Sequence, residues 1–145
     1  MKLFFFIISL LCITAVSASD VAKDNAYKVG QLKVTTLSTM LASRGIGEWG
    51  YSALIEVDGR KILFDTGNRP ETVLQNAKDL RIDLSDVEDV ILSHNHGDHT
   101  GGLETLRKAL HEKNPKALSL VHVGKGIFLQ RAQRDNHMQA MKNRL

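Results

Sequence analysis

The stretch Ser93-His94-Asn95-His96-Gly97-Asp98-His99-Thr100-Gly101-Gly102 decides how this chain is interpreted. It places three imidazoles and one carboxylate within the six positions from His94 to His99. Neither a hydrophobic core nor an ordinary surface requires such clustering, whereas imidazole nitrogen and carboxylate oxygen are the usual ligands of zinc and related transition metals. The loop therefore predicts a metal site, with enough ligand groups for two ions. A solvated histidine-rich loop is the alternative.

The flanking segments are those of an α/β protein. The short apolar run from Asp89 to Leu92 is typical of a strand. After Gly101-Gly102, a helical pattern begins with Leu103, Leu106 and Leu110. A strand end followed by a glycine-loosened loop and a helix start is where α/β proteins place ligand groups.

The spacing of the four side chains suggests how they share two ions. His94 and His96 stand two residues apart, so in an extended segment they point the same way and can bind one ion. Asp98 and His99 follow in a turn opened by Gly97 and can serve a second ion. Two such ions would share a hydroxide that attacks a carbonyl or phosphoryl centre. Asp98 is the predicted catalytic residue, because it can orient the water or take its proton.

Two upstream segments make a family resemblance specific. Residues 62–67 read ILFDTG, and residues 84–94 read LSDVEDVILSH. Together with the HxHxDH loop, they resemble the metallo-β-lactamase-fold hydrolases over roughly residues 31–110. The sequence and spacing of these motifs are similar to those of the dihydropterin-ribofuranosylaminobenzene-phosphate synthase subgroup. The resemblance implies an α/β fold, a four-layer αββα sandwich of two similar halves. This chain would hold the N-terminal half, a mixed, mostly antiparallel sheet flanked by helices.

The resemblance also implies roles for individual residues. His94 and His96 correspond to ligands of one metal site, and Asp98 and His99 to ligands of the other. Asp65, at the end of a predicted strand, corresponds to a second-shell carboxylate that receives an N–H from a metal-bound histidine. A turn-capping role before Thr66-Gly67 is the alternative for Asp65. The family's remaining ligands, a third histidine, a bridging acidic residue and a last histidine, come from its C-terminal half.

Hydrophobic periodicity and turn residues predict the other elements. Strands are expected over residues 27–38, 51–57, 60–64, 89–93 and 117–123, with a hairpin turn at Asp58-Gly59. Helices are expected from Pro70, with Asn68 or Arg69 as cap, and over residues 103–113. Residues 85–88 have capping-box form and predict one short helical turn. Residues 126–145 look helical but broken near Asp135-Asn136.

Several residues near the loop are ambiguous. Trp49 lies in a predicted loop over residues 41–50, and a half-buried packing role is favoured over a substrate-facing lid. Thr100 is expected to have a structural role, capping the helix that follows and holding the loop. His111 is expected on the solvated side of that helix. His122 is expected to be a packed or edge histidine and His137 a surface residue, and none of the three is expected to bind metal.

The N-terminal 18 residues have the features of a cleavable signal peptide. Lys2 precedes an apolar run from Leu3 to Val16, and Val16-Ser17-Ala18 is a small-residue cleavage pattern. The apolar run is shorter than a membrane-spanning helix usually is, which disfavours a membrane anchor. We therefore expect a secreted or periplasmic protein with no membrane anchor after cleavage. The single cysteine, Cys12, would leave with the peptide, so no disulfide or thiolate ligand is expected.

Residues 19–145 would form one partial metallo-β-lactamase-like domain. The chain has 19 Lys and Arg against 16 Asp and Glu, a balance too even to indicate nucleic-acid binding. It ends inside a helical pattern without a stop signal, which favours a truncated chain. The oligomeric state is not indicated.

The leading hypothesis is an exported hydrolase that binds two Zn²⁺ ions or another divalent transition metal. Its substrate would be a small-molecule ester, lactone, β-lactam or phosphoester. The alternative is a non-catalytic metal-binding remnant that needs a missing C-terminal half or a partner. A redox iron enzyme is disfavoured by His96, since diiron relatives tend to place an acidic residue there, and an RNA-processing nuclease is disfavoured by the export signal.

Overall fold

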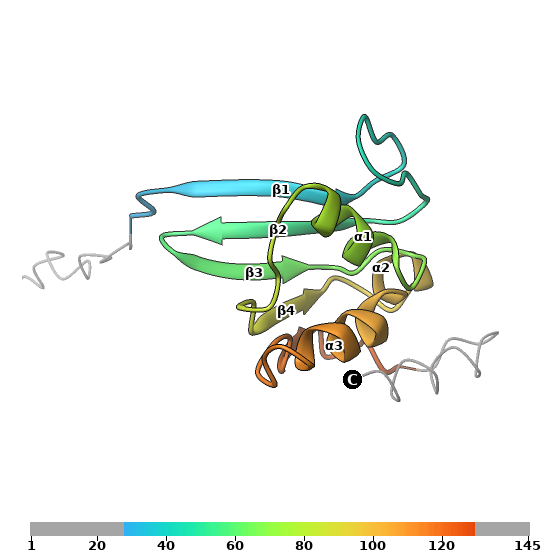
Figure 1. The fold of residues 1–145 in the computed structure, drawn as a ribbon. Helices are drawn as coiled ribbons and strands as arrows, with labels where there is room; N and C mark the ends of the chain where they lie inside the picture. Colours follow the sequence, from blue (N-terminus) through green and yellow to red (C-terminus); the bar gives the residue numbers. More distant parts are fainter. Residues whose placement is uncertain (1–27, 130–145) are drawn as a thin grey trace, which may run out of the picture.

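The computed structural model describes residues 28–129, which form a five-stranded sheet with helices beside it (Figure 1). The strands lie in chain order: β1 (Leu32–Ser38), β2 (Ser52–Val57), β3 (Arg60–Phe64), β4 (Asp89–Leu92) and β5 (Leu120–Val123). β2 pairs antiparallel with β1 and β3, whereas β4 pairs parallel with β3 and β5. The predicted mixed sheet is confirmed, but antiparallel pairing holds only for its first three strands.

The connections between the strands explain which pairs are antiparallel and which are parallel. Asp58 and Gly59 have φ of 46° and 84°, the left-handed conformation that a two-residue hairpin requires, so β2 turns directly into β3. Parallel strands need a longer crossover. The β3–β4 crossover contains helix α1 (Thr72–Asp79), and the β4–β5 crossover contains α2 (Gly97–Thr100) and α3 (Leu103–His111).

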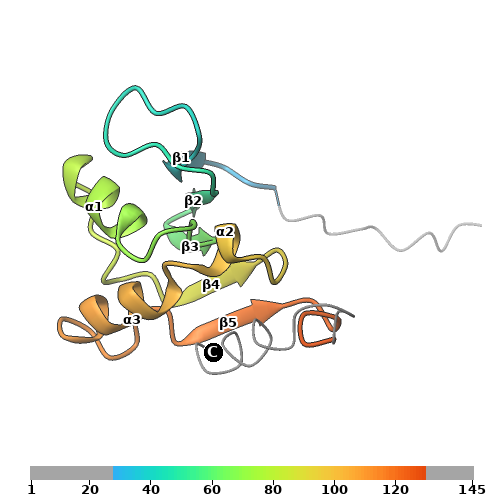
Figure 2. The ribbon, with the colours of Figure 1, turned by 90° about the vertical axis from the view of Figure 1, so that its right-hand side faces the viewer.

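The hydrophobic core lies on one face of the sheet. Leu54, Leu63 and Val90 are neighbours on adjacent strands and are at most 1% exposed. They belong to one cluster with residues of both longer helices, including Val73 and Leu106. Figure 2 shows α1 and α3 on the same side of the sheet, so both helices cover this face.

The opposite face of the sheet is also apolar but more exposed. Val34, Ile55, Ile62 and Leu120 lie along it in one register row, with Asp89 between Ile62 and Leu120. Val34 is 55% exposed and Leu120 is 51% exposed, while Ile55 and Ile62 are half-buried. Within residues 28–129, the alternation of each strand therefore separates a helix-covered face from a more exposed, largely apolar one.

Some local expectations are corrected. α1 begins at Thr72, and its cap position is Glu71, which makes no side-chain cap bond. Asn68 and Arg69 lie before the helix, where their backbone N–H groups donate to a residue described below. The segment from Ser85 forms a turn, with the Val87 N–H donating to the Leu84 carbonyl, and no helix. β5 begins at Leu120 rather than Ala117, because residues 115–118 form turns.

Three predictions lie outside the described residues: the signal peptide, most of the C-terminal helical pattern and the placement of His137. Within residues 28–129, no helix is long and apolar enough to span a bilayer.

Candidate metal centre

The predicted ligands begin directly beyond the end of β4. Residues 93–96 continue from the strand, and His96 is extended, with φ −81° and ψ 148°. The chain then closes into the four-residue helix α2, which carries Asp98 and His99 where a simple turn was expected. This change from extended backbone to one helical turn brings Asp98 back toward the two preceding histidines.

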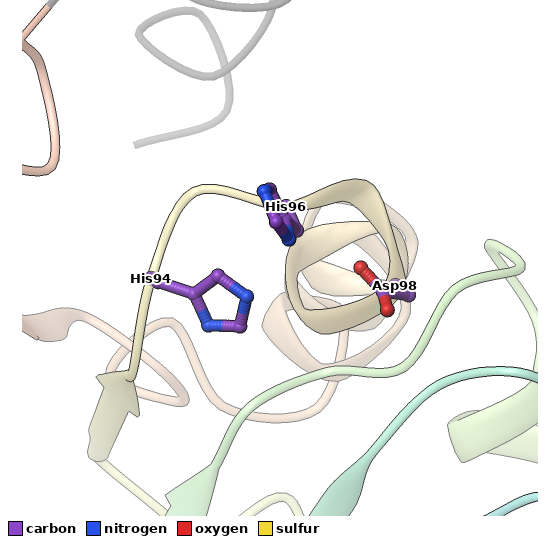
Figure 3. A group of neighbouring side chains, drawn as sticks. All are labelled: His94, His96 and Asp98. Carbon is purple, nitrogen blue, oxygen red and sulfur yellow. The ribbon is translucent and has the colours of Figure 1, made fainter.

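The side chains predicted to bind metal lie close together. One ligand atom each from His94, His96 and Asp98 can be chosen so that all three lie within 4.8 Å of one another. Figure 3 shows these three side chains directed toward a common space beside α2. The ring centroids of His94 and His99 are 4.1 Å apart. The sequence pairs Asp98 with His99, whereas this compact group joins Asp98 to His94 and His96.

The electrostatic state of His94 suits a metal ligand. Partial burial lowers its pKa below the ordinary value, and the nearby His99 and His96 lower it further when they are charged. Neutral imidazole is the form that binds a metal ion. The Ser93 hydroxyl lies 2.9 Å from Nδ1 of His94, which leaves Nε2 available. Two imidazole nitrogens and a carboxylate oxygen are a donor set that fits zinc or a similar divalent ion.

Residues 93–102 carry the candidate ligands and form the metal loop. The Asp65 side chain contacts this loop at Ser93 and His99. Asp65 directly follows β3, adopts the left-handed conformation with φ of 54°, and is completely buried. Its Oδ2 lies 2.7 Å from Nδ1 of His99. The carboxylate also accepts bonds from the Ser93 N–H and hydroxyl, at 2.8 and 2.7 Å. The carboxylate of Asp65 therefore contacts Ser93 and the candidate ligand His99, which is the arrangement predicted for a carboxylate behind a ligand histidine.

The sequence model of the metallo-beta-lactamase superfamily matches residues 49–135, more than half of the chain. The chain belongs to the metallo-beta-lactamase superfamily. The match includes the strand end at Asp65 and the whole metal loop, so the expected family is confirmed.

Three known proteins are similar to parts of this chain. The 7,8-dihydropterin-6-methyl-4-(beta-D-ribofuranosyl)-aminobenzene-5'-phosphate synthase of Methanocaldococcus jannaschii is 40% identical over 98 residues, which are 63% of this chain and 33% of that protein. The anti-Pycsar protein Apyc1 of Saccharibacillus brassicae is 43% identical over 53 residues, 37% of this chain and 21% of that protein. The crystal structure of the metallo-beta-lactamase MIM-1 from Novosphingobium pentaromativorans shares 35% identity and covers 41% of this chain and 22% of that one, with a TM-score of 0.35. The chain thus spans about a third or less of the length of these proteins.

In this superfamily member, backbone hydrogen bonds tie the metal loop to two earlier segments. The Thr66 N–H donates to the His99 carbonyl at 2.7 Å, and the Gly101 N–H donates to the Gly67 carbonyl at 2.9 Å. The Tyr51 N–H donates to the Asp98 carbonyl at 3.1 Å. The backbone of α2 is therefore fixed from both sides, independently of the side chains that it presents.

Two glycines permit this close approach. A Cβ at Gly101 would lie 1.8 Å from the Asn68 carbonyl oxygen, and one at Gly50 would lie 2.9 Å from the Asp98 carbonyl oxygen. Both contacts are with backbone atoms, which cannot move aside as the end of a flexible side chain can. These positions require the absence of a side chain for steric reasons.

Glu48 is a buried carboxylate that supports the site, and the sequence does not reveal it. It is only 4% exposed, and its carboxylate accepts bonds from two backbone N–H groups and two hydroxyls, those of Asn68, Arg69, Ser38 and Thr72. Burial raises the pKa of Glu48, but these four bonds outweigh burial and hold the pKa below its ordinary value. A single glutamate in a glycine-containing loop matches no sequence motif. Only the fold shows that Glu48 joins its own loop to the segment before α1.

Trp49 does not pack into the protein as expected. Its side chain is 69% exposed, and its Nε1 lies 3.1 Å from Oδ2 of Asp98. The favoured packing role was therefore wrong. Its place beside a predicted metal ligand is closer to the alternative, a residue that faces the site.

The other candidate residues have structural contacts. His111 is half-buried rather than solvated, and its Nε2 lies 2.7 Å from the Ala117 carbonyl oxygen. His122 lies exposed on the edge strand β5, as expected, and its Nε2 is 2.6 Å from Oδ1 of Asp89. The Thr100 hydroxyl donates to the His96 carbonyl, whereas the cap position of α3 is Gly102, so the predicted capping role was wrong.

A hollow of about 290 Å³ opens beside the loop and is lined by Thr39, Met40, Trp49, Gly50, Tyr51, Asp98 and His99. A larger hollow, of about 640 Å³, lies between α1 and α3 and contains none of the predicted ligands. Because the chemistry of the site resides in the loop, the smaller hollow is the relevant one.

Proposed function

We propose that this chain provides the metal-binding loop of an exported, metal-dependent hydrolase, with zinc as its resident ion. The observation that carries the proposal is the convergence of His94, His96 and Asp98 within 4.8 Å, beside His99, whose ring is held by the buried Asp65. A hydrophobic core does not require this arrangement. It is the geometry by which proteins present imidazole and carboxylate groups to a divalent ion.

When bound, the metal supplies Lewis acidity, which activates a water molecule and stabilises negative charge on a carbonyl or phosphoryl oxygen. The residues of this chain hold and orient the groups around it. His94 and His96 provide nitrogen ligands, while Asp65 fixes the ring of His99 through its Nδ1. Oδ2 of Asp98 lies 3.7 Å from Nε2 of His99, and in this proposal Asp98 would orient the attacking water or accept its proton.

The substrate would be a small molecule with an ester, lactam or phosphoester bond. The hollow of about 290 Å³ beside Asp98 and His99 is of a size for a small reacting group. The Methanocaldococcus jannaschii relative is named for a phosphate-containing product, which makes phosphoesters the first class to test.

A second candidate function is metal binding without catalysis. A catalytic zinc usually has three protein ligands and one open position, so a second ion would need more ligands than His99 alone adds to this group. The chain also covers only 33% of the synthase relative. Under this alternative, the loop binds one ion and activity requires further residues or a partner chain.

Metal analysis and turnover measurements on the same preparation of the full chain distinguish the two functions. About two ions per chain, with hydrolysis of bis(4-nitrophenyl) phosphate, 4-nitrophenyl acetate or a chromogenic lactam, would support the hydrolase. One firmly bound ion without turnover would support the binding function. Failure of the full chain to retain Zn²⁺ at all would contradict both.

A further inference from the structure

We infer that Trp49 is a positioning residue for the Asp98 carboxylate. The indole Nε1 lies 3.1 Å from Oδ2 of Asp98, and this nitrogen can only donate a hydrogen bond. The bond therefore restrains the rotation of the Asp98 side chain. This inference rests on the proposed function only in taking Asp98 as a metal ligand.

Hydrophobic burial does not explain the position of Trp49. Its side chain is 69% exposed, so its ring gains little from packing. A large, exposed aromatic side chain that nevertheless directs its one polar atom to a predicted ligand indicates a specific placement. The hydrogen bond to Asp98 is the interaction that accounts for the orientation of the indole.

The backbone on both sides of Trp49 is held in place. On its N-terminal side, the buried Glu48 accepts backbone bonds from Asn68 and Arg69 at 2.8 and 2.9 Å. On its C-terminal side, Tyr51 donates its backbone N–H to the Asp98 carbonyl at 3.1 Å. The indole is thus presented to Asp98 from a fixed backbone, and the contact carries little entropic cost on metal binding.

The consequence is a preorganised ligand. Asp98 is only partly buried, and a free carboxylate on a four-residue helix would sample several rotamers. With Oδ2 bonded to the indole, the carboxylate keeps one orientation relative to His94 and His96. Outer partners of metal ligands typically change metal affinity by about 10- to 100-fold. Because Trp49 is exposed, we expect the lower end of that range.

The test is Trp49→Phe in the full chain, which removes the indole N–H and retains an aromatic ring. We expect the Zn²⁺ affinity, measured by competition with a chromophoric chelator, to fall roughly 10-fold. We also expect the visible absorption spectrum of the Co²⁺-loaded protein to change, because it reports the ligand geometry around the ion. Gln75→Met, which removes an N–H donor to the exposed carboxylate of Asp79 on α1, is the control and should leave both measurements unchanged.

A second measurement does not depend on a variant. Trp49 is the single tryptophan of the chain, so the intrinsic tryptophan fluorescence reports this indole alone. Saturation with Zn²⁺ should change the wild-type emission, because the carboxylate bonded to the indole then also binds the ion.

The outcomes separate the two proposals. If the wild type binds no Zn²⁺, the proposed function fails. If the wild type binds Zn²⁺, but Trp49→Phe binds it equally well with an identical Co²⁺ spectrum, only the role of Trp49 fails. A wild-type emission that is unaffected by bound Zn²⁺ would overturn the role of Trp49 in the same way.

Discussion

Nδ1 of His99 lies 2.7 Å from Oδ2 of Asp65, a contact that joins the end of β3 to a metal loop 34 residues later in the chain. The same carboxylate accepts both bonds from Ser93. One buried side chain therefore fixes the beginning of the loop and the orientation of its last histidine.

Asp65→Asn should weaken Zn²⁺ binding by about 10- to 100-fold, the usual cost of losing a carboxylate behind a metal-bound histidine. Asparagine tolerates the φ of 54° at this position, so the backbone strain that alanine would add is avoided. Competition with a chelator measures the effect. Asp86→Asn is the matched control, because Asp86 pairs with Lys61 at the surface. Equal Zn²⁺ affinities of the two variants would show that Asp65 does not support metal binding.

His96→Ala and Asp98→Ala should each lose most of the bound metal, because each removes one of three donor atoms that lie together. His111→Ala should retain the wild-type metal content, although it loses its bond to the Ala117 carbonyl and about 1 kcal/mol of stability. Metal analysis of the folded fraction provides the measurement. A similar loss in all three variants would show that the histidines act through folding and not through ligation.

Gly101→Ala should destabilise the protein strongly, because the new Cβ would lie 1.8 Å from a backbone oxygen. Overpacking of this kind costs about 1–3 kcal/mol or more, since the backbone of α2 must shift. Urea unfolding measures the change in the free energy of unfolding. Gly124→Ala, whose Cβ would meet no atom within 4 Å, is the control and should change stability by at most about 0.5 kcal/mol.

Glu48→Gln should lower the free energy of unfolding at neutral pH by about 2 kcal/mol, because hydrogen bonds to a charged carboxylate are lost. The pKa of Glu48 is lower in the folded protein than its ordinary value of 4.5, so its ionised form stabilises the fold above that pH. This contribution disappears as the pH falls through the folded-state pKa.

The free energies of unfolding of the wild type and of Glu48→Gln should therefore converge at acidic pH. Urea unfolding of wild type and Glu48→Gln at a series of pH values from 7 downwards tests this. A constant difference between the two proteins at all pH values would mean that the charge of Glu48 contributes nothing.

The sequence predicted the parts of the fold that rest on local rules. The hairpin at Asp58-Gly59 follows from the backbone conformation that those residues adopt readily. The helix after the metal loop follows from the spacing of Leu103, Leu106 and Leu110, all of which are buried. Three of the four predicted ligands, His94, His96 and Asp98, lie together because a single short loop carries them.

The contacts that complete the site were not predictable, because they join segments distant in sequence. Glu48 bonds to residues about 20 positions later, and Trp49 reaches a residue 49 positions later. Periodicity does not reveal such partners. Local rules also gave wrong answers. Asn68 does not cap α1, because it lies three residues before the cap position Glu71, in a segment whose backbone N–H groups donate to Glu48. His111 faces the Ala117 carbonyl rather than solvent.

The close approach at Gly50 and Gly101 has a consequence for recognising distant relatives. These two residues contribute no atom to metal binding, yet any larger residue would force the helix that carries Asp98 away from its supports. A homologue that kept every histidine and aspartate but replaced either glycine would preserve the signature and lose the architecture behind it. A search for functional homologues should weigh these two silent positions alongside the ligands themselves.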